Sequence, residues 1–278
     1  MRAVVADALA DVPEPVGDGV LVHVRACGLC GSDVEKLGRA GAVLGHEVEG
    51  LLDDGTRVTV LHRVPCGECA RCAAGHESTC ESFRTTRITP GGFAERLLAT
   101  NVLALPDGVP GVWVEPLACV LRAAESVPHG RVLVVGCGAI GRLWIQVLQR
   151  RGDEVVAVDP RADRLASSGA LVDADPVDAA VLTAHAGVND ALARLEPGGT
   201  LLVFAAPDEL VPVSLDAIYR GELRLVGSRS ATPAAFRAGI ELLPSLELPE
   251  VTTLPLERFA EGVELYRSGE ALKVVFEP

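Results

Sequence analysis

Four closely spaced cysteines are the strongest candidates for chemistry in this 278-residue chain. The segment CGECARCAAGHESTC carries Cys66, Cys69, Cys72 and Cys80, which are separated by two, two and seven residues. Four thiolates at this spacing suit a tetrahedral zinc ion, and a donor set with no open position indicates a structural role. Iron–sulfur clusters also use four cysteines, but the ferredoxin motifs are spaced differently. The segment therefore predicts a structural zinc site.

A glycine-rich turn has the pattern of a dinucleotide-binding site. The sequence GCGAIG follows the apolar run Val132–Val135 and opens an amphipathic helix. Gly136 permits the tight turn, Gly138 lets the backbone approach a pyrophosphate, and Gly141 lets the helix pack on the strand. Amide groups at the helix start would face the phosphates. The predicted cofactor contacts at this turn are Gly136, Gly138, Ala139, Ile140 and Gly141.

An acidic residue in the same region favours NAD as the cofactor. Asp159 ends the next apolar strand, 18 residues after the third glycine of the motif. Its carboxylate can accept hydrogen bonds from ribose hydroxyls and would repel a 2′-phosphate, so NADP is the weaker prediction. Arg161 either offsets this preference in part or is a solvated charge. His185 lies near the expected nicotinamide end of the sheet, where a residue without a role is the simpler interpretation.

A further set of metal donors lies upstream, in CGLCGSD (27–33) and LGHEVEG (44–50). Cys30, His46 and Glu47 offer a thiolate, an imidazole and a carboxylate, which are all donors that zinc accepts. Each residue is ambiguous when taken singly, because a cysteine or a lone histidine is more often an ordinary packed residue. Their interpretation as a metal site therefore depends on the rest of the chain.

The composition excludes several classes of function. Acidic residues exceed basic ones by 38 − 25 = 13, so the chain lacks the basic character of a general nucleic-acid binder. No segment approaches the roughly 20 apolar residues that span a bilayer. The N-terminal segment does not have the pattern of a signal peptide. We therefore expect a cytoplasmic protein with reduced thiols, whose partner is a small molecule.

The elements that must position these residues fall into two regions. Before Pro116, short β-like runs lie among many Gly and Pro residues, which predicts an irregular, mostly β domain. After Arg131, apolar strands alternate with helices, which predicts a doubly wound α/β domain. Thr232 and Pro233 predict the start of a late helix that runs to about Leu243, and the tail reads as helix, turn and strand. The main strand candidates are Leu21–Val24, Arg57–Leu61, Leu97–Leu103, Val132–Val135, Glu154–Val158, Ala170–Val172, Ala179–Leu182, Thr200–Phe204 and Leu223–Val226.

Taken together, the motifs resemble the zinc-dependent medium-chain dehydrogenases/reductases, the superfamily of alcohol, polyol and threonine dehydrogenases. The matching segments occur in family order: CGLCGSD, GHE, the four-cysteine loop, PGGFAE (90–95), VEPLAC (114–119), VGCGAIG (135–141), AVDP (157–160), LEPGGTLLVF (195–204) and SGEALKVV (268–275). The resemblance implies a doubly wound parallel-sheet (Rossmann) domain over residues 120–228. It also implies a mostly β, GroES-like catalytic domain over residues 1–119 and 229–278.

The resemblance further implies the ligands of a catalytic zinc ion. Cys30 and His46 match the thiolate and imidazole ligands. Glu47 matches a carboxylate beside the metal that ligates it in some members. The last protein ligand is either Glu115, as in polyol-type members, or Cys119, as in several alcohol dehydrogenases. The sequence EPLA favours Glu115.

Other matching residues would handle protons and the cofactor. Ser32 matches the hydroxyl that passes on the substrate proton, and Asp33 matches a carboxylate that orients the histidine ligand. Glu35 occupies the position at which many members carry a proton-relay histidine, so the exit route here would run through a carboxylate or water. Lys273 matches a basic position near the cofactor pyrophosphate in some relatives, and a solvated terminal lysine is the other interpretation.

The function implied by the resemblance is a zinc-dependent hydride transfer between a secondary-alcohol or polyol-type carbinol and NAD(P). One catalytic and one structural zinc ion per chain are expected, in a homodimer or homotetramer. A zinc-independent enone or quinone reductase is an alternative, but it would lack the Cys–His pair and the cysteine loop. The other alternative is a non-catalytic relative that binds a nucleotide or a metal. It is motivated by loops that look trimmed relative to the family, after GHEVEG, around Thr85–Ile88 and between Asp178 and Asn189.

Overall fold

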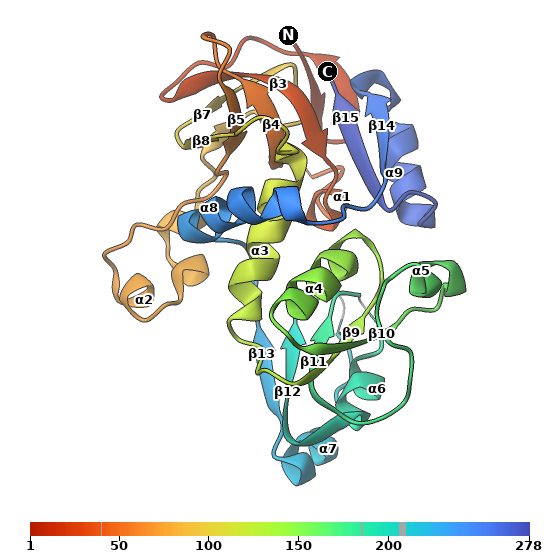
Figure 1. Ribbon diagram of the computed structural model, residues 1–278. Coiled ribbons are helices and arrows are strands. Elements are labelled where there is room, and N and C mark those ends of the chain that lie inside the picture. Colours follow the sequence, from red (N-terminus) through yellow and green to blue (C-terminus); the bar gives the residue numbers. More distant parts are fainter. Residues whose placement is uncertain (40, 185, 206–209) are drawn as a thin grey trace. The chain divides into compact units, whose positions relative to one another are not determined.

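The computed structural model describes residues 1–39, 41–184, 186–205 and 210–278, and it divides the chain into two units. Unit 1 comprises Met1–Ala118 and Ala231–Pro278, and unit 2 comprises Cys119–Ser230. Figure 1 shows the elements of both units. Within the described ranges, no helix combines the length and the apolar character needed to cross a membrane. His185 lies outside the described residues.

Unit 1 is built on a mixed, mainly antiparallel sheet. Its strands are β3 (Val20–Gly28), β4 (Glu47–Leu51), β5 (Arg57–Val60), β6 (Ile88–Thr89), β7 (Arg96–Ala99), β8 (Val102–Ala104), β14 (Val251–Pro255) and β15 (Lys273–Glu277). The hairpin β1 (Arg2–Val5) and β2 (Ala8–Asp11) forms a separate two-stranded sheet. The predicted run Leu97–Leu103 is not one strand, because β7 pairs with β3 whereas β8 pairs with β5, and the chain turns between them.

The helices of unit 1 are short apart from three. Its α-helices are α1 (Gly31–Val34), α2 (Ala70–Ala73), α3 (Val114–Ala124, which continues into unit 2), α8 (Pro233–Leu242) and α9 (Phe259–Ser268). Its 3₁₀ turns are η1 (Glu77–Thr79), η2 (Ser82–Arg84), η3 (Gly111–Trp113), η4 (Leu243–Ser245) and η5 (Leu256–Arg258). The predicted start of α8 is confirmed, because the Thr232 hydroxyl accepts a hydrogen bond from the Ala235 amide at 3.3 Å and Pro233 is the first helical residue.

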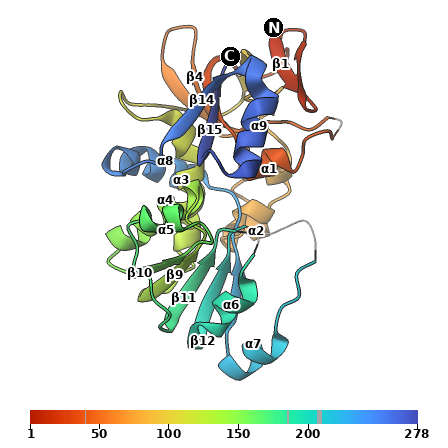
Figure 2. The same cartoon turned by 90° about the vertical axis from the view of Figure 1, so that its right-hand side faces the viewer.

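The C-terminal segment completes the core of unit 1. The tail folds as helix, turn and strand as predicted, with α9 followed by β15 (Figure 2). Strand β15 pairs antiparallel with β3. Phe276 on β15 packs against Phe259 and Phe93, with ring centroids 4.9 and 5.4 Å away. All three rings are buried, so they join segments that are far apart in the sequence.

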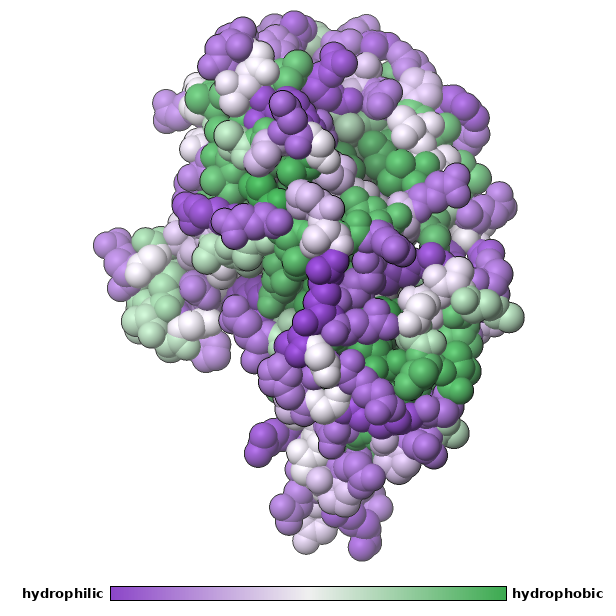
Figure 3. Space-filling model, viewed as in Figure 1, coloured by the Kyte–Doolittle hydropathy of each residue, from purple (hydrophilic) through white to green (hydrophobic). Residues whose placement is uncertain are grey.

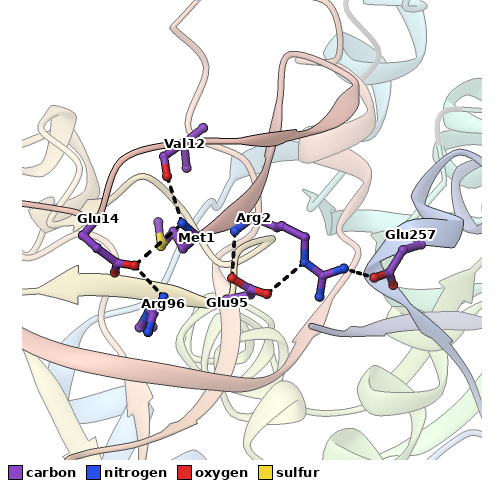
Figure 4. Close-up of polar contacts among 7 residues, drawn as sticks. All are labelled: Met1, Arg2, Val12, Glu14, Glu95, Arg96 and Glu257. Carbon is purple, nitrogen blue, oxygen red and sulfur yellow. Dashed lines mark hydrogen bonds and ion pairs between the residues drawn. The ribbon is translucent and has the colours of Figure 1, made fainter.

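Polar contacts attach the N-terminus to the same unit (Figure 4). The Arg2 side chain donates to Glu95 at 2.9 Å and also pairs with Glu257 in η5. The terminal ammonium of Met1 donates to the Val12 carbonyl at 3.0 Å. Ion pairs as exposed as these contribute little to stability, so their main effect is to fix where the ends of the chain lie.

Unit 2 is a parallel sheet with helices on its faces, which confirms the predicted doubly wound fold. The strand order is β10 (Glu154–Val158), β9 (Arg131–Val135), β11 (Val177–Leu182), β12 (Leu195–Val203) and β13 (Arg224–Gly227). The helices are α4 (Ala139–Arg150), α5 (Ala162–Ala166), α6 (Val188–Ala193) and α7 (Leu215–Gly221). Helix α4 packs on β9 and β10, and α6 packs on β11 and β12.

The predicted strand Ala170–Val172 is reduced to a single bridge. Leu171 forms one parallel bridge with Val156 on β10. Counting this bridge as a strand, the order becomes that of a six-stranded doubly wound sheet. Residues 172–176 then lead directly to β11 without a helix, although a parallel crossover usually needs about a dozen residues. This short crossover lies before Asp178, and the trimmed loop expected between Asp178 and Asn189, which includes His185, stays a prediction.

The phenylalanine cluster generates a stability prediction. Phe276→Ala should lower the free energy of unfolding by about 3–5 kcal/mol, because it leaves a cavity beside the two remaining buried rings. Val16→Ala is the matched control, since this side chain is 88% exposed and its loss should change stability by about 0.5 kcal/mol or less. Urea denaturation followed by circular dichroism would measure both, and equal midpoints would contradict the assigned role of the cluster.

Candidate metal and cofactor sites

The four cysteines form one compact cluster in unit 1. They lie on the loop that contains α2 and η1, which projects at the left of Figure 1 and is pale in Figure 3 because it is rich in alanine and cysteine. All four Sγ atoms lie within 4.8 Å of one another. The closest pairs are Cys69–Cys72 at 3.5 Å, Cys66–Cys80 at 3.6 Å and Cys66–Cys72 at 3.9 Å.

These separations fit a tetrahedral zinc ion. Four sulfurs about 2.3 Å from one ion lie about 3.8 Å from one another. The Cys66 amide donates to Cys80 Sγ at 3.5 Å and lowers the pKa of that thiol to about 6. A lowered pKa favours the thiolate, which is the form that binds metal. The loop can therefore hold a structural zinc ion without rearrangement of its backbone.

A second cluster is organised by the buried carboxylate of Asp33 on α1. It accepts hydrogen bonds from the Gly45 amide at 3.1 Å, the Cys30 amide at 3.3 Å and His46 Nδ1 at 3.2 Å. These contacts bind the turn before α1 to the segment before β4. Because Nδ1 of His46 is engaged, its Nε2 is left to face a metal ion, which is the usual arrangement for a ligating imidazole.

The same contacts set the protonation of the cluster. Burial would raise the pKa of Asp33, but His46 and the Gly45 amide lower it below its usual value. Burial would lower the pKa of His46, but Asp33 and Cys30 raise it well above its usual value. Metal binding at His46 must therefore displace a proton.

Glu47 is already engaged by Lys273. Both side chains are buried, and the Lys273 ammonium pairs with the Glu47 carboxylate and donates to the Leu29 carbonyl at 3.4 Å. The ammonium also lies 5.4 Å from the centroid of the Trp113 ring. Burial opposes the charge of Lys273, but Glu47 raises its pKa. The interpretation of Lys273 as a solvated lysine is thus wrong, and its contact with a cofactor stays a prediction.

Two groups of possible ligands share His46. Cys30, His46 and Glu47 bring their ligand atoms within 4.8 Å of one another, and so do His46, His62 and Glu115. Cys119 lies one turn beyond Glu115 on α3 and belongs to neither group within the described part of the chain. Glu115 therefore lies within reach of His46, and the choice between Glu115 and Cys119 as the last protein ligand stays a prediction.

The predicted proton-transfer residues lie on α1. The Ser32 hydroxyl donates to Cys30 Sγ at 3.5 Å, and Glu35 is exposed at the end of the helix. Tyr266 on α9 approaches the same turn, because a Cβ added to Gly31 would lie 2.9 Å from its hydroxyl oxygen. Burial and the nearby anionic groups, Cys30 first, raise the pKa of Tyr266. Sequence reasoning assigned no role to Tyr266 or His62, since neither belongs to a spaced motif.

The glycine turn of unit 2 has the geometry expected of a dinucleotide site. Gly136 has a positive φ of 99°, which only glycine adopts without strain. A Cβ on Gly141 would overlap the Gly136 carbonyl oxygen, whereas a Cβ on Gly138 would meet nothing within 4 Å. Ala139 and Ile140 open α4 and are half-buried.

The carboxylate of Asp159 ties the end of β10 to this turn. It accepts hydrogen bonds from the Cys137 amide at 2.7 Å and from the Arg161 amide at 2.8 Å. The Arg161 guanidinium lies 3.0 Å from Asp163. Asp159 is therefore held beside the glycine turn, and its contact with a ribose stays a prediction.

Substitutions at Gly141 and Gly138 should separate an effect on folding from an effect on cofactor binding. Gly141→Ala should destabilise unit 2, because the new methyl group overlaps backbone. Gly138→Ala should leave the unfolding transition near that of the wild type but weaken NAD binding at least tenfold, because the methyl group stands where the pyrophosphate approaches. Thermal unfolding and calorimetric titration with NAD would measure the two effects, and wild-type affinity in Gly138→Ala would rule out this site.

The four-cysteine loop also predicts how the zinc content of the protein should change when one of its cysteines is replaced. Cys66→Ser should lose one zinc ion per chain relative to the wild type, as measured by elemental analysis, because three thiolates hold zinc less firmly than four. Cys27→Ala is the control, since this thiol is buried in the core outside the cluster. An unchanged zinc content in Cys66→Ser would contradict the assignment.

Comparisons with known proteins agree with this geometry. Residues 17–107 match the model of the alcohol dehydrogenase GroES-like domain. The D-altritol 5-dehydrogenase of Agrobacterium fabrum is 32% identical, over 82% of this chain and 81% of the relative. The galactitol-1-phosphate dehydrogenase of Escherichia coli superposes with a TM-score of 0.84 at 26% identity, over 100% of both chains. The acetophenone reductase of Geotrichum candidum shares the fold, with a TM-score of 0.88 at 21% identity over 100% of this chain and 97% of that one.

Proposed function

The chain belongs to the zinc-type medium-chain alcohol and polyol dehydrogenases, and we propose that it transfers a hydride between NAD and a secondary alcohol group of a polyol-type substrate. The observation that carries the proposal is the cluster in which Asp33 fixes His46 beside Cys30. This cluster and the cysteine loop argue against a zinc-independent enone or quinone reductase, which would need neither.

The donor set fits a catalytic zinc ion. Cys30, His46 and Glu115 would supply one thiolate, one imidazole and one carboxylate. Three protein ligands are typical of catalytic zinc sites, which keep a position for the substrate. The ion pair with Lys273 holds Glu47, which supports Glu115 as the carboxylate ligand. With the cysteine loop, the chain would bind two zinc ions.

The chain's own residues would position the substrate and move its proton. When bound, zinc supplies Lewis-acid polarisation of the substrate oxygen, and the nicotinamide accepts the hydride. The Ser32 hydroxyl lies beside Cys30, so it is placed to take the proton from the substrate hydroxyl. Glu35 lies three residues further along α1 and is exposed, so it can pass that proton to solvent.

Asp159 supports NAD rather than NADP as the cofactor. Its carboxylate at the end of β10 would repel a 2′-phosphate. Arg161 could have offset that repulsion, but its guanidinium is paired with Asp163. A lowered KM for NAD relative to NADP is therefore expected with every substrate.

The activity prediction separates an enzyme from a non-catalytic relative. Cys30→Ser should reduce NAD-linked oxidation of polyols by about a thousandfold or more, since it removes a metal ligand. Asp33→Asn should weaken metal binding about 10–100-fold through the orientation of His46. His23→Gln is the control, because this partly exposed side chain pairs only with Asp53 among the contacts that the structure gives it.

The measurement is a panel of polyols and secondary alcohols with NAD⁺ and NADP⁺, followed by absorbance of the reduced nicotinamide. Zinc content is measured on the same preparations. Wild-type rates in Cys30→Ser would overturn the mechanism. A wild-type chain that retains one zinc ion and oxidises nothing in the panel would favour a non-catalytic binding protein.

A further inference from the structure

An imidazole that the proposed mechanism does not use lies beside His46, one of the proposed zinc ligands. His62 follows β5, and its ring centroid is 4.6 Å from that of His46, at an interplanar angle of 43°. Its Nδ1 atom is buried and has no hydrogen-bond partner within the described residues. Buried polar atoms are rarely left without a partner, so an unpartnered ring nitrogen at this place calls for an explanation.

The neighbours of His62 are metal donors. The ligand atoms of His46, His62 and Glu115 all lie within 4.8 Å of one another. Nitrogen and oxygen donors about 2.0–2.1 Å from one tetrahedral zinc ion are separated by about 3.4 Å, so small side-chain rotations would bring all three onto one ion. Two imidazoles and one carboxylate are an established composition for catalytic zinc.

The other donors near His46 differ in how freely they can reach the ion. Glu47 is held by Lys273, whereas the Cys30 thiol accepts a hydrogen bond from Ser32 at 3.5 Å and lies beside His46. His46 is thus shared by two sets of ligand atoms, one with Cys30 and Glu47 and one with His62 and Glu115. An ion that joined Cys30 to the second set would have four protein donors, the number that a tetrahedral ion requires. Of the two histidines, His46 is anchored through Asp33, and Nδ1 of His62 has no such anchor.

We propose that His62 is a fourth protein ligand of the metal ion held by Cys30, His46 and Glu115. The inference rests on the proposed function, because it concerns the same ion. His62 closes the coordination sphere of the substrate-free protein, and the substrate competes with it for this position. Because Nδ1 of His62 has no anchor like the one that Asp33 gives His46, His62 is the imidazole that the substrate replaces.

The test is zinc affinity, measured by dialysis against graded zinc buffers and elemental analysis. His62→Phe keeps a ring but removes both nitrogens. It should lower the affinity for one of the two zinc ions by about 10–100-fold or more, since even outer-sphere partners have effects of this size. The affinity for the other zinc ion should be unchanged. His62→Glu supplies a new donor and should restore part of the affinity. His23→Phe removes a histidine of the same unit outside both ligand groups and should bind zinc like the wild type.

Exchange of the ion for Co²⁺ gives a second readout. The d–d absorption bands report the ligands of the ion, so they should change in His62→Phe and not in His23→Phe. Wild-type zinc affinity and an unchanged cobalt spectrum in His62→Phe would overturn the proposal. His62 would then lie near the ion without binding it. If circular dichroism shows His62→Phe to be unfolded, His62→Gln takes its place in the same two measurements.

The result is separable from failure of the proposed function. A wild-type chain that binds one zinc ion, which Cys66→Ser removes, would mean that the catalytic site holds no metal. Two zinc ions in the wild type, one of them lost in Cys30→Ser and neither weakened in His62→Phe, would overturn the role of His62 alone.

Discussion

The site depends on one buried carboxylate. Asp33 is fully buried, and a charge in that position is stable only if it is well paired and hydrogen-bonded. The amides of Cys30 and Gly45 and the ring of His46 provide these partners from two segments of the chain. The same contacts bring the thiol of Cys30 and the imidazole of His46 together, with their ligand atoms within 4.8 Å of each other. The requirement to satisfy Asp33 therefore also builds the proposed metal site.

The C-terminal segment extends this arrangement from far away in the sequence. Strand β15 pairs with β3, and this pairing brings Lys273 to Glu47 next to His46. A buried ion pair adds little stability by itself, but each partner would be costly to bury alone. The return of the chain to unit 1 thus places a buried cation beside the proposed metal site and also packs Phe276 into the core.

Local motifs made much of the fold and site predictable. The cysteine spacing and the glycine pattern each act within a short segment, so the cluster at Cys66 and the turn at Gly136 could be expected from the sequence. The sequence could not predict that the expected strand Ala170–Val172 is reduced to a bridge at Leu171, because this depends on how residues 172–176 cross the sheet. The sequence assigned no role to His62 or Tyr266 for a related reason: only tertiary packing brings His62 to His46 and Tyr266 to the turn at Gly31.

The balance of charge explains why the cluster suits a divalent cation. Within the described residues, the buried carboxylates of Asp33, Glu47 and Glu115 lie near a single buried ammonium, that of Lys273. The thiol of Cys30 adds a further negative charge once it is deprotonated. A dication would offset the excess, and a neutral imidazole is the donor that could join it without adding charge. Burial and the positive groups around His62, His46 first among them, lower the pKa of that imidazole well below its usual value.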